Sequence, residues 1–298
     1  MNIVTMKKVH NLNKRGVTLV ELTIVIGILG FLTGLLLSGI QAVRDSAEYV
    51  EHLNWLRQRR LDCPPQRKNL RVVFIGNSKT YYQDMPGIVV EFAKIIGTDI
   101  KAKVVVQGGQ SLEGHWNDNS NAQNAIASEW NDFVILQDRG ALPYYEPDLY
   151  QEYASKFCVL TNNDAITLLF VTWETPIMYQ TPVTQQIVLA IQKQENKGSE
   201  ICAIGEAWKA SVIERPDINL YLNGDVLHPN ENGAYLTACV IHSVLHRISP
   251  VGLPNSIVTK NGTAVFVDSE FANYLQNIAW KTAEKFRKKY KPYYLSEK

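Results

Sequence analysis

Short apolar runs that alternate with stretches long enough to form helices constrain the fold of this chain more than any other feature. The runs lie at 71–75 (RVVFI), 103–106 (KVVV), 132–136 (DFVIL), 166–172 (ITLLFVT) and, more weakly, 200–204 (EICAI). Between and after them, helical patterns cover 86–96, 148–160, 184–194, 233–245 and a closing 266–290. Strands that alternate with helices predict an α/β fold, in which helices sandwich a parallel sheet. Sites in such folds form at the carboxyl ends of the strands.

The composition is that of a folded globular protein, with 46% hydrophobic and 20% charged residues. Its 298 residues suffice for one large α/β domain and an appendage. A formal net charge of +1 gives no electrostatic reason to expect nucleic-acid binding. The four cysteines form no CxxC pair, and no His/Cys/Asp cluster has metal-ligand spacing. We therefore expect neither a metal nor an organic cofactor.

The N-terminal region has the pattern of a membrane anchor. Residues 17–40 are nearly all apolar with Glu21 as the only charge, and about 20 such residues can span a bilayer. The basic residues that precede this run favour a cytoplasmic N-terminus, which leaves the rest of the chain outside. A helical pattern continues beyond the run until Pro64 and Pro65 end it. The expected parts are a leader, long membrane helix and extension at 1–62, a linker at 63–70 and a globular domain at 71–298.

The junction before the apolar run, Lys14-Arg15-Gly16-Val17-Thr18-Leu19-Val20-Glu21, resembles a type IV prepilin leader. In that family a peptidase cuts after the glycine, and a glutamate occupies the fifth mature position. Gly16 and Glu21 match both features, whereas Val17 stands where the family usually has phenylalanine. The resemblance implies a prepilin peptidase as a partner and a place in the bacterial cell envelope, anchored in the inner membrane with the globular domain outside the cytoplasm. A plain, uncleaved membrane anchor is the alternative.

Three clusters of polar residues and glycines stand at the ends of expected strands or at the start of a helix. Ser78 follows the first run, so its hydroxyl would project from a strand-to-helix turn. Gly109 follows the second run, where a glycine lets a backbone N–H approach a ligand. Asp225 and His228 share one loop before 233–245 and can supply both a base and the group that orients it. Each cluster alone is also typical of an ordinary turn or helix cap, but together they predict a Ser–His–Asp triad.

These clusters resemble the SGNH (GDSL-like) hydrolases, and more narrowly a bacterial branch with a GNSFTYY-like first block. The matching segments are 74–82 (FIGNSKTYY), 108–116 (GGQSLEGHW), 134–138 (VILQD), 205–208 (GEAW), 225–229 (DVLHP) and 249–253 (SPVGL). The resemblance covers about residues 71–253 and implies a flavodoxin-like fold. It also implies that Ser78 is the nucleophile, that Asp225 and His228 complete the triad, and that the backbone of Ser78 and Gly109 contributes to the oxyanion hole.

One block departs from the family pattern. The third block is normally GxND, whose asparagine completes the oxyanion hole, but this chain has Leu136-Gln137-Asp138 there. Because Gln137 also carries an NH2 donor, we predict that it replaces the asparagine. The alternative is that Gln137 binds loop backbone. Four further residues are candidates for a substrate pocket, with a packed interior as the alternative: Asn77, His115, Trp116 and Trp173.

The resemblance implies serine-dependent hydrolysis of acyl esters through an acyl-enzyme, without a cofactor. The expected substrate is an acylated small molecule or glycan, with acetyl groups on carbohydrate as the leading case because the domain is expected outside the cytoplasm. Two alternatives remain. One is a catalytically inactive pilin-like structural or carbohydrate-binding module, and the other is a lipid acyl hydrolase near the membrane.

Overall fold

The computed structural model describes residues 19–20, 22–34, 36–37, 40, 68–118, 121–128, 130–140, 142–161, 165–173 and 199–289. The chain divides into two compact units, 1–51 and 52–298. In the first unit, residues 22–34 are helical. Among the residues that the structure describes, no helix combines the length and hydropathy that crossing a membrane requires. The expected span over 17–40 includes residues outside the described ones, as does the expected helix over 184–194.

The second unit is built on a five-stranded sheet with the order β2-β1-β3-β4-β5, in which every neighbouring pair is parallel. This confirms the predicted parallel α/β sheet. Its strands are β1 (Asn69–Gly76), β2 (Asp99–Val106), β3 (Phe133–Gln137), β4 (Ile166–Phe170) and β5 (Ser199–Cys202). A hairpin that the sequence analysis missed consists of β6 (Ser256–Val258) and β7 (Ala264–Phe266).

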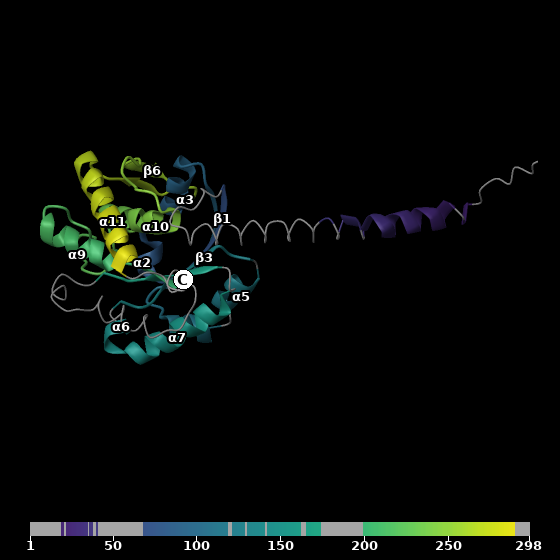
Figure 1. Ribbon diagram of the computed structural model, residues 1–298, viewed down its shortest axis with the longest axis horizontal. Helices are drawn as coiled ribbons and strands as arrows, with labels where there is room; N and C mark the ends of the chain where they lie inside the picture. The colour runs from purple at the N-terminus through teal and green to yellow at the C-terminus, as the bar shows by residue number, and fades with distance from the viewer. Residues whose placement is uncertain are drawn as a thin grey trace, which may run out of the picture. The chain divides into compact units, whose positions relative to one another are not determined.

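Helices lie in the connections from β1 to β2, from β2 to β3 and from β3 to β4, and further helices follow β5. The larger ones are α3 (Met85–Ile95), α7 (Pro147–Leu160), α9 (Ile204–Glu214), α10 (Glu231–His246) and α11 (Ser269–Lys289). The shorter ones are α2 (Ser78–Tyr81), α4 (Leu112–Asn117), α5 (Asn121–Ala127) and α6 (Leu142–Tyr145). In Figure 1, α3, α10 and α11 lie on one side of the sheet, and α5 and α7 lie on the other.

The two faces of the sheet bury separate apolar clusters. The larger cluster joins β1, β3 and β4 to α3, α9, α10 and α11, and includes Phe74, Phe92, Trp208 and Tyr235. The smaller joins the opposite side of the same strands to α4, α5 and α7, and includes Phe157. Because inward-facing side chains alternate along a strand, each strand contributes to both clusters. The sheet is therefore fixed from both sides, as predicted.

Strand β2 departs from the expected double cover. It lies at the edge of the sheet, and most of its residues are exposed or half-buried. The chain passes from β1 to β2 on one side and returns to β3 on the other, so the direction of winding changes between β1 and β3. Ligands in open α/β sheets bind at the carboxyl ends of strands beside such a change. This places the segments after β1 and β3 at the centre of any site.

Candidate active site

Ser78 is the first residue of α2, immediately after the end of β1. Asn77 caps this short helix, because its side chain accepts a hydrogen bond from the Lys79 backbone N–H at 3.2 Å. A residue at the start of a helix has no intrahelical acceptor for its N–H. The turn therefore presents both the hydroxyl and the N–H of Ser78, which itself is half-buried.

A buried network holds this turn from below. The Gln137 Oε1 atom accepts from the Asn77 N–H at 2.8 Å and from the Thr80 hydroxyl at 2.9 Å. The His115 Nε2–H donates to the Gly76 carbonyl at 2.7 Å, and burial lowers the pKa of His115, so its ring is neutral. A Cβ at Gly76 would lie 2.5 Å from Thr80 Oγ1, so only glycine fits there.

Lys79, next to the nucleophile candidate, was not singled out by the sequence analysis. Its side chain is buried, and its Nζ donates to Thr172 Oγ1 at 3.0 Å and to the Trp173 carbonyl at 2.7 Å. The ammonium group also lies 4.8 Å from the centre of the Trp173 ring. Lys79 thus joins the start of α2 to the segment that follows β4. No sequence pattern signals a buried lysine, because its partners come from a distant strand.

Asp225 and His228 complete a hydrogen-bonded chain with Ser78. The His228 Nδ1–H donates to Asp225 Oδ2 at 2.5 Å, and His228 Nε2 lies 3.0 Å from Ser78 Oγ. The other carboxylate oxygen, Oδ1, accepts from the N–H groups of Leu227 and His228 at 2.6 and 3.1 Å. With a proton fixed on Nδ1, the neutral ring can accept the serine proton at Nε2.

The carboxyl group of Asp225 is held in its charged form. Burial pushes its pKa up, but the hydrogen bonds from the His228 ring and from the backbone of Leu227 and His228 outweigh that effect and leave the pKa below its ordinary value. An ionised carboxylate can stabilise the imidazolium that forms when His228 takes a proton. The geometry therefore fits a nucleophile, a base and an orienting acid in their usual roles.

Aromatic rings fix the loop that carries the base. The Trp173 Nε1–H donates to the Leu227 carbonyl at 2.9 Å, and the Trp173 ring is stacked on Trp208 with centroids 3.9 Å apart. On the other side, the Tyr82 ring stacks on the His228 imidazole at 4.4 Å. The position of His228 thus depends on contacts with the turn that follows α2 and with the segment that follows β4.

The expected oxyanion donors differ in their placement. Gly109 is exposed and has a φ of +68°, so its backbone bends into a tight turn after β2. Asn77 Nδ2 donates to the Gln110 carbonyl at 2.9 Å, which ties this turn to that of Ser78. The backbone N–H groups of Ser78 and Gly109 remain the candidate donors.

Gln137 is wrongly predicted as an oxyanion donor. Its side chain is 0% exposed, its Oε1 is bound beneath the Ser78 turn, and its Nε2 donates to the Asp138 carbonyl. Ile75 pairs with Leu136, so Gly76 lies beside Gln137, and the missing side chain at Gly76 lets the glutamine pass under the turn. The structure instead agrees with the alternative interpretation, in which the Gln137 side chain binds the backbone of the loops, here the Asn77 N–H and the Asp138 carbonyl.

Three of the four pocket candidates are buried, whereas the fourth, Trp116, is half-buried. Asn77, His115 and Trp173 are each at most 5% exposed. Trp116 packs edge-on against Phe157 in the smaller apolar cluster, at a centroid distance of 5.1 Å. The buried positions of Asn77, His115 and Trp173 contradict the prediction that they line a pocket, and for Trp116 it stays a prediction.

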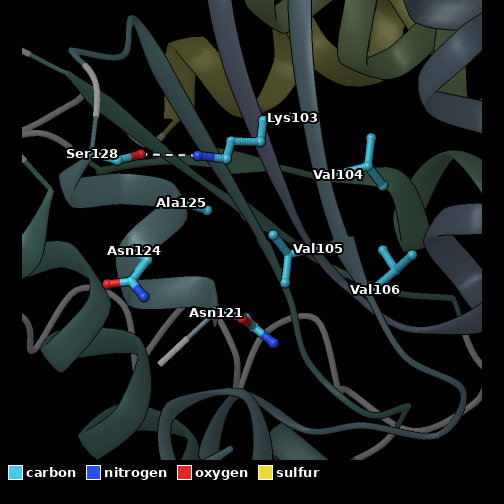
Figure 2. A pocket seen from close by; sticks show the side chains of 8 residues that line it. All are labelled: Lys103, Val104, Val105, Val106, Asn121, Asn124, Ala125 and Ser128. Carbon is cyan, nitrogen blue, oxygen red and sulfur yellow. Dashed lines mark hydrogen bonds between the residues drawn. The ribbon is translucent and has the colours of Figure 1, made fainter. Parts of the chain in front are cut away.

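Two open hollows lie on the surface of the described residues. One, of about 570 Å³, lies between β2 and α5, where Lys103 Nζ donates to Ser128 Oγ at 2.9 Å (Figure 2). It is lined by no triad residue. The other, of about 520 Å³, is called the Tyr82 hollow here and is lined by Tyr81, Tyr82, Gln83, Asp84, Asn261 and Thr263. The Tyr82 ring that lines it is the one stacked on His228.

Within the described residues, no group of three or more His, Cys, Asp or Glu side chains is placed to hold a metal ion. No protein-family model matches the chain, and no curated protein does.

Solved structures do match. A DUF4886 family protein from Bacteroides uniformis aligns with a TM-score of 0.59 and 17% identity, over 72% of this chain and 94% of its own. A protein from Slackia heliotrinireducens, provisionally described as an SGNH hydrolase, gives a TM-score of 0.49 and 21% identity over 59% of this chain and 99% of its own. A lipase/acylhydrolase from Enterococcus faecalis gives a TM-score of 0.47 and 13% identity, over 61% of this chain and 98% of its own. The globular domain therefore shares its fold with the Bacteroides uniformis protein.

Proposed function

We propose that this protein hydrolyses acyl esters through a covalent acyl-enzyme formed on Ser78. The observation that carries the proposal is the continuous hydrogen-bonded chain from Ser78 Oγ to His228 Nε2 and from His228 Nδ1 to Asp225 Oδ2. Such a chain activates a serine hydroxyl that is otherwise a weak nucleophile. A structural histidine would need neither the serine hydroxyl at its Nε2 nor the charged carboxylate at its Nδ1.

The proposed reaction has two steps, acylation of Ser78 and hydrolysis of the acyl-enzyme. Ser78 Oγ attacks the ester carbonyl and gives its proton to His228, and the tetrahedral intermediate collapses when the bond to the alcohol breaks and His228 protonates the leaving oxygen. Water then gives a proton to His228 and attacks the acyl-enzyme, and the second intermediate collapses when the bond to Ser78 Oγ breaks and His228 returns the proton to that oxygen, which releases the carboxylic acid. Backbone N–H groups of Ser78 and Gly109 would stabilise the negative oxygen in both intermediates.

The finer proposal is that the acyl group is acetyl and that the alcohol is a carbohydrate. Its support is the position expected for the domain, outside the cytoplasm. For that position we propose anchoring through residues 17–40, either as an uncleaved helix or after processing at Gly16. A lipid acyl hydrolase and an inactive binding module are the competing readings.

Labelling with a fluorophosphonate probe tests the proposal, because the reagent reacts only with an activated serine. We expect the full-length protein to be labelled, and we expect Ser78→Ala and His228→Ala to lose both labelling and turnover of an acetyl ester by several orders of magnitude. Asp217→Asn, at an exposed surface ion pair, is the matched control. Wild-type labelling in Ser78→Ala would overturn the assignment.

A further inference from the structure

We propose that the Tyr82 hollow binds the alcohol part of the substrate, and that this alcohol is a neutral, hydroxyl-rich ring such as a sugar. The inference rests on the proposed ester hydrolysis and adds where the leaving group binds and what chemistry recognises it. The observation behind it is that Tyr82 both lines the hollow and stacks on His228, with ring centroids 4.4 Å apart.

The leaving oxygen of an ester must receive its proton from His228, so the alcohol must depart on the side of the imidazole. The Tyr82 ring is stacked on the His228 imidazole, so a group bound against Tyr82 in the hollow lies next to a ring that contacts the histidine. The hollow of about 520 Å³ falls within the usual size of small-molecule sites. Position and size therefore both fit the alcohol part of an ester.

The walls of the hollow select the chemistry of that alcohol. Its aromatic rings come from Tyr81 and Tyr82, and its polar groups are the carboxylate of Asp84, the side-chain amides of Gln83 and Asn261 and the hydroxyl of Thr263. Tyr81 is 41% exposed, which leaves ring surface for the apolar face of a sugar.

The charge of the lining distinguishes a sugar from a lipid. The six lining residues include one carboxylate and no cation, so a phosphate headgroup would meet repulsion and no ion pair. An alkyl chain would offer no hydrogen-bond partner to the carboxylate, the amides and the hydroxyl of the lining, and it would stay partly in water because the hollow is open. Sugar hydroxyls can donate to the Asp84 carboxylate and exchange hydrogen bonds with the amides. The lining thus favours a neutral polyol over a lipid.

The backbone at the hollow is held in an uncommon conformation. Gln83 and Asp84 have φ values of 55° and 48°, so two successive residues that are not glycine are left-handed. Such strain persists only where the surroundings hold it, and it is concentrated at ligand-binding and active sites. Asn261, from the loop between β6 and β7, donates to Asp84 Oδ2 at 3.1 Å and so joins the turn to the hairpin. The carboxylate is thereby held at the hollow before any ligand arrives.

The test compares substrates with large and small alcohols. For the full-length protein, kcat/KM is measured for O-acetylated xylotriose and cellotriose, for chitotriose esterified on its hydroxyl groups, and for ethyl acetate, whose alcohol is too short to fill the hollow. We expect Asp84→Asn, which keeps a residue tolerant of the left-handed conformation, to lower the ratio of the best sugar ester to ethyl acetate about ten-fold through a higher KM. Asn261→Ala is expected to lower the same ratio. The matched control, Asp99→Asn, makes the same chemical change at the opposite, amino end of the sheet.

A second measurement separates the two proposals. Binding of the three unacetylated trisaccharides to Ser78→Ala is followed by NMR, and we expect at least one to bind and Asp84→Asn to weaken it about ten-fold. If the wild type hydrolyses none of the esters, the proposed function fails while the binding result still decides the hollow. If hydrolysis stands, but the ratio does not change in Asp84→Asn and none of the sugars binds, the hollow is not the alcohol site.

Discussion

The two halves of the triad are built in different ways. The nucleophile half, the turn from Gly76 to Thr80, is held by buried side chains such as Gln137 and His115. The base half is a partly exposed loop, in which the side chains of His228 and Asp225 are 27% and 30% exposed. The loop is held by hydrogen bonds within itself, by one hydrogen bond from the Trp173 indole and by the Tyr82 ring that stacks on His228. Stability and reactivity should therefore respond separately to changes in the two halves.

The two parts of the site also shift the pKa of a carboxyl group in opposite directions. In the base half, hydrogen bonds keep the pKa of Asp225 below its ordinary value despite burial. In the nucleophile half, burial raises the pKa of Asp138 to about 6, although its Oδ1 accepts from the N–H groups of Leu112 and Arg139. Within the described residues, Asp138 Oδ2 is buried and has no hydrogen-bond partner. The surroundings of Asp225 thus stabilise its charged form, whereas those of Asp138 make its charged form cost folding stability.

The largest effect should come from Asp225→Asn, which alters only the base half. The amide oxygen can still accept from the Leu227 and His228 N–H groups, but the NH2 would face His228 Nδ1 and force the ring proton onto Nε2. A ring protonated at Nε2 cannot accept the serine proton, so kcat should fall about 10³–10⁴-fold. Ester hydrolysis and thermal melting are the measurements. A melting temperature that collapses along with kcat would contradict the separation of the halves.

Gln137→Leu should act mainly on stability. It removes the acceptor of the Asn77 N–H and of the Thr80 hydroxyl, and a buried donor left unpaired costs about 1–3 kcal/mol. Chemical denaturation measures this loss. A variant of unchanged stability whose kcat falls about 10²–10³-fold would instead restore Gln137 as an oxyanion donor.

Asp138→Asn should change how stability depends on pH. The unfolded carboxyl titrates near 3.8 and the folded one near 6, so wild-type stability should fall as the pH rises between these values. The variant lacks this loss and should be more stable than the wild type at pH 8, by about 1–3 kcal/mol. Free energies of unfolding at acid and alkaline pH provide the check. Parallel pH curves for the two proteins would show that the Asp138 pKa is not raised.

The smallest effect should come from Trp173→Phe. The substitution keeps an aromatic ring on Trp208 but removes the N–H that binds the Leu227 carbonyl. The loop should then hold His228 less well, with kcat falling about ten-fold at constant KM, since misplacement of a catalytic group raises the barrier. Trp208→Phe, which shortens the other ring of the same stacked pair and removes its bond to Thr237 but leaves the Trp173–Leu227 bond in place, is the matched control. Equal losses of kcat in both variants would mean that packing, rather than the loop contact, is responsible.

The main elements could be read from the sequence because they depend on local pattern. Strand and helix alternation predicted β1 to β5 within a few residues, and glycine and serine after β1 marked the nucleophile turn. Asp225 and His228, three residues apart, can meet within one loop wherever that loop lies. What pattern analysis missed was the hairpin β6–β7, whose strands are only three residues long.

The sequence by itself determined the parallel sheet and the residues that can form the triad, because period, spacing and residue type suffice for these. Only the tertiary structure decided the roles of the side chains around them. Gln137 lies under the turn because β3 pairs with β1 next to Gly76, which has no side chain to exclude it. Lys79 is buried because Thr172 and Trp173, which follow β4, accept hydrogen bonds from its ammonium group. Burial and long-range partners depend on which strands become neighbours, and that information is not local in the chain.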